Sequence, residues 1–397
     1  MSQTKAELAF HALDTLSIEL PSWGFADTGT RFGKFYEPGA ARTIEEKLQD
    51  GGHVHRLTGA CPSVAVHVAW DFPQGVQSVP AVAAVAEGEG VRIGSVNPTL
   101  FEDQSYKFGS LANLDEAVRK KAIGHVRDSV DILNAVGGRD LVLWLADGSN
   151  YPGATDIRRR KHLLQDGLHE IHTWLTGQQR LLVEYKPFEP AFYHTDIADW
   201  GMALLLARSA GPRARVLVDT GHHFPGQNIE QIVTWLLDEN MLGGFHFNDK
   251  KYADDDLTAG SIDPYQLFRI LVEIHSWAFE TGSFPDIAFM VDQSHNIKPK
   301  IEATIQTVTT IQELYVKSAL VDFERLYECR RKHRVIDAES VLRSAFFSDV
   351  QPLVEDWRRR RGLPTDPLQA HRESGYAERV ARERGCQGGG PSRYAGV

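Results

Sequence analysis

The sequence RVLVDTGHHFPGQNIEQIVTWLLDENMLGGFHFND, residues 215–249, contains a complete strand–helix–strand unit. Its ends, RVLVDTG and GGFHFND, are short runs of β-branched and aromatic residues, as in buried strands. Between them, IEQIVTWLLDEN places apolar residues at helical spacing. Strands that alternate with helices in this way feed a parallel sheet.

The same unit recurs along most of the chain, because further apolar runs alternate with helix-periodic segments. The predicted strands lie in LSIELPSW (16–23), SVAVHVAW (63–70), GVRIGSV (90–96), DLVLWLA (140–146), RLLVEYK (180–186), RVLVDTG (215–221), GGFHFND (243–249) and IAFMVDQ (287–293). The intervening helix that begins at Asp115 ends in a pair of glycines, which is a natural C-cap. Eight strand–helix units predict an α/β protein with a (β/α)8, or TIM, barrel.

From about residue 300 the pattern is helical without further strands. We therefore predict a catalytic barrel domain over residues 1–310 and an α-helical extension over residues 311–397. The glycine-rich end of the extension, GCQGGGPSRYAGV, is expected to be flexible. Such an extension usually embraces a neighbouring subunit, although helices packed on their own barrel would look the same in sequence.

The composition argues against several classes of protein. The chain has 397 residues and a formal net charge of -10, the wrong sign for a nucleic-acid partner. Cys61, Cys329 and Cys386 form no CxxC pair, so neither a disulfide framework nor a thiolate zinc site is indicated. No basic segment followed by an apolar one opens the chain, and no apolar run of about 18 residues occurs. We expect a cytoplasmic protein without a membrane partner.

Polar residues stand at the carboxyl ends of four successive predicted strands, where the active site of such a barrel lies. They are Glu184 and Lys186 in RLLVEYK, Asp219 in RVLVDTG, His246 in GGFHFND and Asp292 in IAFMVDQ. Because side chains alternate along a strand, Glu184 and Lys186 must share one face. Three carboxylates and an imidazole around one rim predict a site for Mn²⁺, Zn²⁺ or Mg²⁺. Four separately satisfied polar groups are the less favoured alternative, since acids are rarely buried unpaired.

A second group of polar residues follows the same strands. His222 comes directly after one of them, and Asp254 and Asp256 lie shortly after the next. The spacing Asp254-x-Asp256 lets two carboxylates converge while Asp255 points away. With His222 they are candidates for a second, more loosely held cation whose shell water completes. On its own, a run of three aspartates is usually a solvated loop.

Aromatic residues and a histidine indicate a pocket beside these ligands. His67 shares its inward face with Ala65 and Ala69, whose small side chains leave room, although a core histidine is the usual explanation for such a residue. Trp144 points inward on its strand before DGSN. Trp144 and Trp23 are candidate contacts of a ligand, and plain core packing is the alternative for both.

At these residues the sequence resembles the L-rhamnose isomerase family, especially its branch of bacterial enzymes active on several rare aldohexoses and ketohexoses. The matching segments, in order from residue 21 to about residue 296, are PSWGFADTGTRF, HVAWDFP, SYKFGSL, WLADGSNYPG, EYKPFEPAFY, LVDTGHH, GGFHFNDKKYADDDL and VDQSHN. The C-terminal ESGYAERVA also looks familial. The first part of the chain is shorter than in some relatives, which leaves the N-terminal helix and its subunit contacts less defined.

The resemblance implies an aldose–ketose isomerase with two divalent cations in each subunit. The first, structural cation would be bound by Glu184, Asp219, His246 and Asp292, and the second, catalytic cation by His222, Asp254 and Asp256. Lys186 would hydrogen-bond the oxygens near C1 and C2, and His67 would lie where the sugar ring opens; Glu184 and Asp292 join them as catalytic candidates. Mn²⁺ is the expected cation, with Co²⁺, Zn²⁺ or Mg²⁺ as substitutes.

The resemblance also implies a substrate and an assembly. Trp144 would wall the pocket with Trp23, and Phe32 would reach into the site of an adjacent subunit of a homotetramer. The expected reaction interconverts L-rhamnose and L-rhamnulose, with L-lyxose, L-mannose and the pair D-allose and D-psicose as further substrates. We expect a metal-assisted hydride shift. Proton transfer through an enediol, which would draw Glu184 away from its ligand role, stays open.

Two rival interpretations use the same fold. Metal-dependent phosphodiesterases that cut abasic DNA, the AP endonucleases, have a similar barrel, but they need a basic surface that a net charge of -10 disfavours. In a non-catalytic barrel the metals would serve only stability, and Lys186 and His67 would lack a purpose. A sugar isomerase is therefore the preferred interpretation.

Overall fold

A computed structural model of the chain describes residues 4–30, 33–151, 153–187 and 194–386. Eight parallel strands close into a barrel in the order β1-β12-β11-β10-β8-β6-β5-β4. Their bounds are β1 Ile18–Pro21, β4 Ser63–His67, β5 Arg92–Asn97, β6 Asp140–Leu143, β8 Arg180–Glu184, β10 Ala214–Asp219, β11 Leu242–Phe247 and β12 Ala288–Val291. Each overlaps the run predicted for it, so the predicted (β/α)8 barrel is confirmed.

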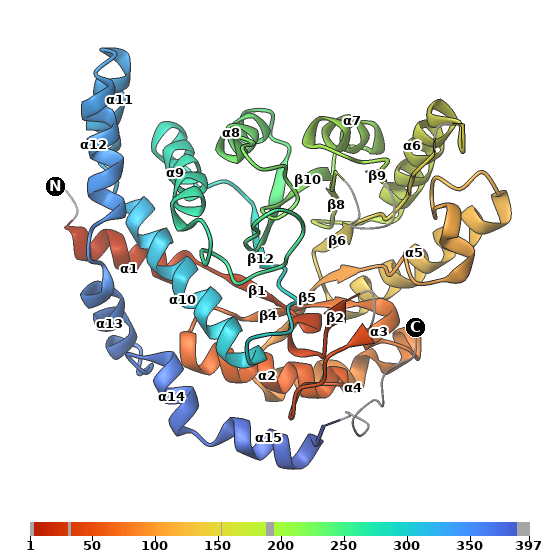
Figure 1. The fold of residues 1–397 in the computed structure, drawn as a ribbon, viewed down its shortest axis with the longest axis horizontal. Helices are drawn as coiled ribbons and strands as arrows, with labels where there is room; N and C mark the ends of the chain where they lie inside the picture. Colours follow the sequence, from red (N-terminus) through yellow and green to blue (C-terminus); the bar gives the residue numbers. More distant parts are fainter. Residues whose placement is uncertain (1–3, 31–32, 152, 188–193, 387–397) are drawn as a thin grey trace.

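Helices surround the barrel (Figure 1). The helices before and between the strands are α1 Lys5–Thr15, α2 Ile44–Thr58, α3 Val68–Asp71, α4 Val79–Gly88, α5 Glu116–Val136, α6 Ile157–Trp174, α7 Trp200–Ala210, α8 Ile229–Asp238 and α9 Pro264–Thr281. The C-terminal ones are α10 Lys300–Ala319, α11 Phe323–Arg331, α12 Val335–Phe346, α13 Gln351–Arg360, α14 Pro367–Glu373 and α15 Tyr376–Arg384. None of the helices in the described ranges is both long and apolar enough to cross a lipid bilayer.

Smaller elements lie in the connections. They are the 3-10 helices η1 Ser22–Phe25, η2 Gly75–Ser78 and η3 Gln104–Phe108, and the strand pairs β2 Gly29–Thr30 with β3 Gly33–Lys34 and β7 Gly148–Ser149 with β9 His194–Thr195. Both strand pairs and η1 belong to loops that leave the carboxyl ends of barrel strands. These loops therefore border the rim where the polar strand ends gather.

Local sequence signals set the ends of the helices. A capping box opens α2, in which Thr43 and Glu46 each accept the other's backbone N–H. Gly137 ends α5 with a positive φ of 65°, a conformation that a residue with a Cβ adopts rarely. The glycine pair predicted to end this helix does so.

Alternation along the strands separates two apolar regions. Outward-facing side chains such as Val183 and Phe245 pack against the helices in the main core. Inward-facing side chains form a small cluster inside the barrel, made of Val142, Leu182, Leu217 and Met290. Two residues further along the chain from these stand Trp144, Glu184, Asp219 and Asp292. The polar strand ends therefore lie one layer above this apolar cluster, towards the carboxyl ends of the strands.

Of the C-terminal helices, α13, α14 and α15 pack on their own barrel, whereas α11 and α12 pair with each other and extend away from it (Figure 1). α13 lies against α1 and α10, α14 lies against α10 and α2, and α15 follows α14 (Figure 1). Trp357 of α13 shares a small buried cluster with Leu13 and Val316, which belong to α1 and α10. Arg384 of α15 forms a buried ion pair with Asp50 of α2, with Nη1 and Oδ2 2.8 Å apart.

The sequence left open whether the tail packs on its own barrel or on a neighbouring subunit. Packing on its own barrel is therefore observed within a single chain. A role in subunit contacts stays a prediction. The domain boundary predicted at residue 310 falls inside α10, Lys300–Ala319, and the division into two domains stays a prediction as well.

Two buried imidazoles meet where α14 lies against α2. Nε2 of His53 and Nδ1 of His371 are 3.0 Å apart, and the His53 ring stacks on Tyr376 with centroids 3.9 Å apart. Burial, followed by the nearby His371 and Arg56, lowers the pKa of His53 to about 3. His53 is therefore neutral in the folded protein at neutral pH.

Acidification is expected to weaken this packing. The unfolded chain binds a proton at His53 below its ordinary pKa of 6.5, whereas the folded chain does so only near pH 3. The contribution of neutral His53 to the free energy of unfolding is thus complete above its ordinary pKa, and it is lost as the pH falls. His53→Gln cannot bind this proton. Between about pH 7.5 and about pH 5, the midpoint of thermal unfolding should therefore fall less in this variant than in the wild type, and the difference between the two decreases should be on the order of 2–4 °C. Equal losses in both proteins would show that His53 does not titrate in this way.

Candidate metal centre and active site

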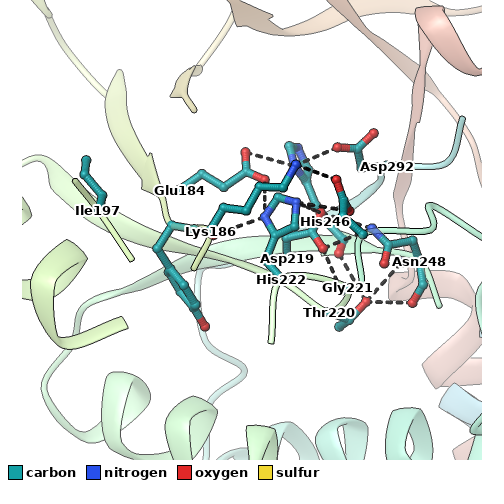
Figure 2. A network of polar contacts seen from close by, with 12 residues as sticks. Glu184, Lys186, Ile197, Asp219, Thr220, Gly221, His222, His246, Asn248 and Asp292 are labelled. Carbon is teal, nitrogen blue, oxygen red and sulfur yellow. Dashed lines mark hydrogen bonds and ion pairs between the residues drawn. The ribbon is translucent and has the colours of Figure 1, made fainter. Parts of the chain in front are cut away.

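Four neighbouring barrel strands bring the first predicted ligand set together (Figure 2). Glu184, Asp219, His246 and Asp292 each offer one ligand atom, and these atoms all lie within 4.8 Å of one another. Asp292 is half-buried and the other side chains are buried. The structure therefore gathers all the residues predicted for the first cation. Their role as ligands stays a prediction.

Glu184 lies between two imidazoles. Its Oε2 is 3.3 Å from Nδ1 of His246, and its Oε1 is 3.3 Å from Nδ1 of His222. Oδ2 of Asp292 is 3.7 Å from the same Nδ1 of His246. A single buried carboxylate thus connects the first ligand set to the residues predicted for a second cation.

The second set borders the same space. Nε2 of His222 is 3.3 Å from Oδ1 of Asp254 and 4.0 Å from Oδ2 of Asp219. Asp256 lines the same cavity, and its backbone is left-handed with a φ of 46°, a conformation that aspartate adopts more readily than most residues. Asp255 instead accepts hydrogen bonds from backbone N–H groups of its own loop, so it points away as predicted.

Burial and like charges place these acids under strong electrostatic strain. Burial, followed by the charges of Glu184 and Asp292, raises the pKa of Asp219 to about 7. Burial and neighbouring carboxylates also raise the pKa of Asp256 well above its ordinary value. Burial alone would lower the pKa of His246, yet Glu184 and Asp292 raise it to about 9. The site thus favours the binding of positive charge, either as a metal cation or as protons on its own histidines and acids.

The donor atoms fit a divalent cation. Both ring nitrogens of His246 and Oδ1 of Asp254 are buried. Although Nδ1 of His246 and Oδ1 of Asp254 have ionic partners at 3.3 Å, none of the three atoms meets the geometry of a hydrogen bond within the described part of the chain. Carboxylate and imidazole donors suit Mn²⁺, Zn²⁺ and related cations. Nδ2 of Asn248 lies 3.0 Å from both carboxylate oxygens of Asp219, and the N–H of Gly221 donates to Oδ1 at 2.7 Å. Such outer bonds fix the orientation of a ligand.

A cavity of about 290 Å³ opens beside these residues. Its polar wall contains Glu184, Lys186, His222, His246, Asp254, Asp256 and Asp292. The aromatic side chains that line it are Trp23, His67, Trp70, Phe101 and Trp144. The cavity can therefore contact both the polar and the apolar faces of a small molecule.

Lys186 and His67 both line this cavity. Nζ of Lys186 donates to Oδ2 of Asp254 at 2.5 Å and lies 4.9 Å from the centre of the Trp144 ring. Nδ1 of His67 is 3.3 Å from Oγ1 of Thr99. Burial, followed by the charge of Lys47, lowers the pKa of His67 to about 3, so its imidazole is neutral.

Of the other aromatic residues predicted to contact the substrate, two line the cavity and one is not described by the structure. Trp23 lines the cavity, and its Nε1 donates to Oδ1 of Asp292 at 2.7 Å. Trp144 also lines the cavity, with a buried Nε1 that makes no hydrogen bond to any described residue. Phe32, predicted to reach an adjacent subunit, lies outside the described residues.

Several lining residues were not predicted. Asn97 ends β5 at the same rim, so the rule of polar strand ends could have identified it. Phe101 and Ser294 stand in loops, and Trp70 lies in the short helix α3, where no spacing rule points to a cavity. Their positions depend on tertiary packing.

Comparison with known proteins gives consistent matches. A family model described as a xylose isomerase-like TIM barrel matches residues 63–300. A probable sugar isomerase of Rhizobium meliloti (strain 1021) is 39% identical over 378 residues, which cover 94% of this chain and 87% of that protein. A probable sugar isomerase of Mesorhizobium japonicum (strain LMG 29417 / CECT 9101 / MAFF 303099) is 37% identical over 383 residues, covering 95% and 88%.

Solved structures share the fold at lower identity. The D-allulose 3-epimerase from Methylomonas sp. superposes with a TM-score of 0.55 at 12% identity, covering 75% of this chain and 98% of that one. At this identity the likeness concerns the barrel alone.

Removing one ligand should weaken cation binding. In Asp292→Asn and His246→Ala we expect the dissociation constant for Mn²⁺ to rise by at least roughly 10-fold. Loss of a residue that only hydrogen-bonds a metal ligand can already weaken binding by this factor, and these variants lose a ligand itself. Titration of metal-stripped protein followed by calorimetry measures it. Asp255→Asn is the matched control, since Asp255 lies in the same loop as Asp254 but faces its own backbone. Full Mn²⁺ affinity in both ligand variants would refute the ligand assignment.

Proposed function

The chain belongs to the xylose isomerase-like TIM barrel family, and we propose that it is a metal-dependent aldose–ketose isomerase of the L-rhamnose isomerase type. The observation that carries the proposal is the convergence of Glu184, Asp219, His246 and Asp292 beside a cavity that three of them line together with aromatic side chains. Relatives named probable sugar isomerases, with 39% and 37% identity over nearly the whole chain, support it.

The proposed first cation is held by Glu184, Asp219, His246 and Asp292, and the second by His222, Asp254 and Asp256. When bound, divalent cations polarise carbonyl and hydroxyl oxygens and so stabilise negative charge that develops there. Mn²⁺ is our proposed activator, with Co²⁺, Zn²⁺ or Mg²⁺ as substitutes, because mixed carboxylate and imidazole donors do not select sharply.

Lys186 is the proposed donor to the oxygens at C1 and C2 of the sugar. Its ammonium group is already oriented, because Asp254 accepts its hydrogen bond and the Trp144 ring lies beside it. A donor fixed before the substrate arrives stabilises oxygen charge without reorganisation.

His67 is the proposed acid–base group for ring opening. A neutral imidazole can accept the proton of the anomeric hydroxyl and return one to the ring oxygen. Its burial and the charge of Lys47 keep it neutral, so a ring nitrogen is free of a proton, and the lowered pKa limits it to passing the proton on to the ring oxygen rather than holding it.

We propose that hydrogen moves from C2 to C1 as a hydride. The alternative route needs a carboxylate to remove a proton from C2, and Glu184 is the candidate. Both oxygens of Glu184 already face imidazole nitrogens at 3.3 Å, and although burial opposes it, His246 and His222 lower its pKa. A carboxylate so engaged is a weak base, which supports the hydride route.

L-rhamnose is the proposed substrate because its 6-methyl group suits the aromatic wall of Trp70, Phe101 and Trp144. One hydroxyl adds little discrimination in an apolar pocket, so L-lyxose, L-mannose, D-allose and D-psicose should react with altered efficiency. We further propose that the enzyme is a cytoplasmic homotetramer in which Phe32 of one subunit reaches the site of the next.

Metal-stripped protein should form no ketose from L-rhamnose, and added Mn²⁺ should restore the reaction. A panel of aldoses, with the ketose product quantified for each, ranks the substrates. Metal-dependent turnover of another aldose alone would keep the reaction class and replace the substrate. No turnover of any aldose, together with cleavage of DNA that contains an abasic site, would overturn the proposal in favour of a phosphodiesterase.

A further inference from the structure

A buried carboxylate beside the cavity takes no part in the proposed reaction. Asp71 is the last residue of the single-turn helix α3 and is 1% exposed. Its Oδ2 accepts hydrogen bonds from Oγ of Ser22 at 2.5 Å and from the backbone N–H of His67 at 2.9 Å. Its Oδ1 accepts from Nζ of Lys47 at 2.5 Å. One carboxylate therefore joins η1, the end of β4 and α2.

The bond to His67 fixes the backbone at the point where the strand becomes a helix. His67 ends β4 and is the N-cap residue of α3, and no side chain caps this helix in the usual way. Asp71 instead reaches back to the N–H of His67. The direction in which the His67 side chain leaves the backbone thus depends on Asp71.

The bond to Ser22 leads to the predicted metal ligands. Trp23 follows Ser22, and its Nε1 donates to Oδ1 of Asp292 at 2.7 Å. The Trp23 ring also packs edge-on against the His67 imidazole, with centroids 4.8 Å apart and planes at 74°. Both branches from Asp71 therefore end at groups that border the cavity and contact each other.

The ion pair with Lys47 is a costly way to hold a fold together. The side chains of Lys47 and Asp71 are 5% and 0% exposed, so both charges are desolvated. A buried pair of this kind is often matched or exceeded in stability by apolar residues of similar volume. What apolar residues cannot provide is a set of directed hydrogen bonds to His67 and Ser22.

We propose that Asp71, held by Lys47, is a positioning residue that fixes the His67 imidazole and the Trp23–Asp292 hydrogen bond relative to each other. Its effect on turnover rests on the proposed function. Its effects on Trp23 and on cation binding do not. Loss of the acceptor atoms of Asp71 should therefore disturb both the pocket wall and a predicted ligand.

Two double variants separate positioning from charge. Lys47→Met/Asp71→Leu removes both charges and the acceptor oxygens, whereas Lys47→Met/Asp71→Asn removes both charges but keeps an acceptor. Asp50→Asn serves as a stability control, because Asp50 lies on the same helix α2, is 2% exposed and pairs with Arg384 away from the cavity.

Each variant is measured in three ways. The ¹⁵N-labelled indole signal of Trp23, assigned with Trp23→Phe, reports its hydrogen bond to Asp292 without turnover. Calorimetric titration gives the Mn²⁺ dissociation constant, and steady-state assays give kcat and KM.

The leucine double variant should shift the Trp23 signal, weaken Mn²⁺ binding and lower kcat, the last two by roughly 10- to 100-fold. The asparagine double variant should remain near the wild type, and Asp50→Asn should change only the unfolding temperature. The proposal is overturned if the leucine variant matches Asp50→Asn, or if both double variants lose these properties equally. If the wild type turns over no sugar, the proposed function fails while the Trp23 signal and Mn²⁺ affinity still decide the role of Asp71.

A milder variant covers the case in which the leucine double variant does not fold. Ser22→Ala removes one donor to Asp71 and leaves the ion pair intact. It should shift the Trp23 indole signal in a folded protein. An unchanged signal would refute the proposed connection between Asp71 and Asp292.

Discussion

Repulsion among buried and half-buried carboxylates at the rim of the barrel is the constraint on which the site depends. The acids concerned are Glu184, Asp219, Asp254, Asp256 and Asp292. Burial and their mutual repulsion raise the pKa of Asp219 to about 7, and the protein offsets part of the charge with His222 and His246, whose pKa values rise to about 9. Such a cluster is costly unless a positive charge joins it, so cation binding and the structure of the rim are coupled.

The barrel makes this concentration of charge possible. Each acid or imidazole of the first ligand set comes from a different strand, so no local segment has to hold more than one of them. Below them the apolar side chains Leu182, Leu217 and Met290 exclude water from the barrel interior. Around them Asn248, Trp23 and the Asp71 network hold individual groups in place. The predicted ligands of the first cation thus stand at the ends of rigid strands, and the supporting bonds come from the loops and helices around them.

Much of the barrel and the core of the site could be predicted from sequence because both follow short-range rules. Runs of β-branched residues mark the strands, and period-two alternation places Glu184 and Lys186 on one face. Longer-range features had no such signal. Trp23 and Asp292 are separated by 269 positions, Lys47 and Asp71 meet only through the packing of α2 on β4, and Phe101 enters the cavity from a loop. Helical periodicity likewise predicted a helical tail without showing whether its helices pack on their own barrel or on a neighbouring subunit.

The decisive measurement is anomalous diffraction from a crystal soaked at millimolar Mn²⁺, collected on both sides of the manganese absorption edge. We expect one anomalous peak coordinated by Glu184, Asp219, His246 and Asp292, and a second, weaker one beside His222, Asp254 and Asp256. A map without a peak at the first position would contradict the proposed metal site.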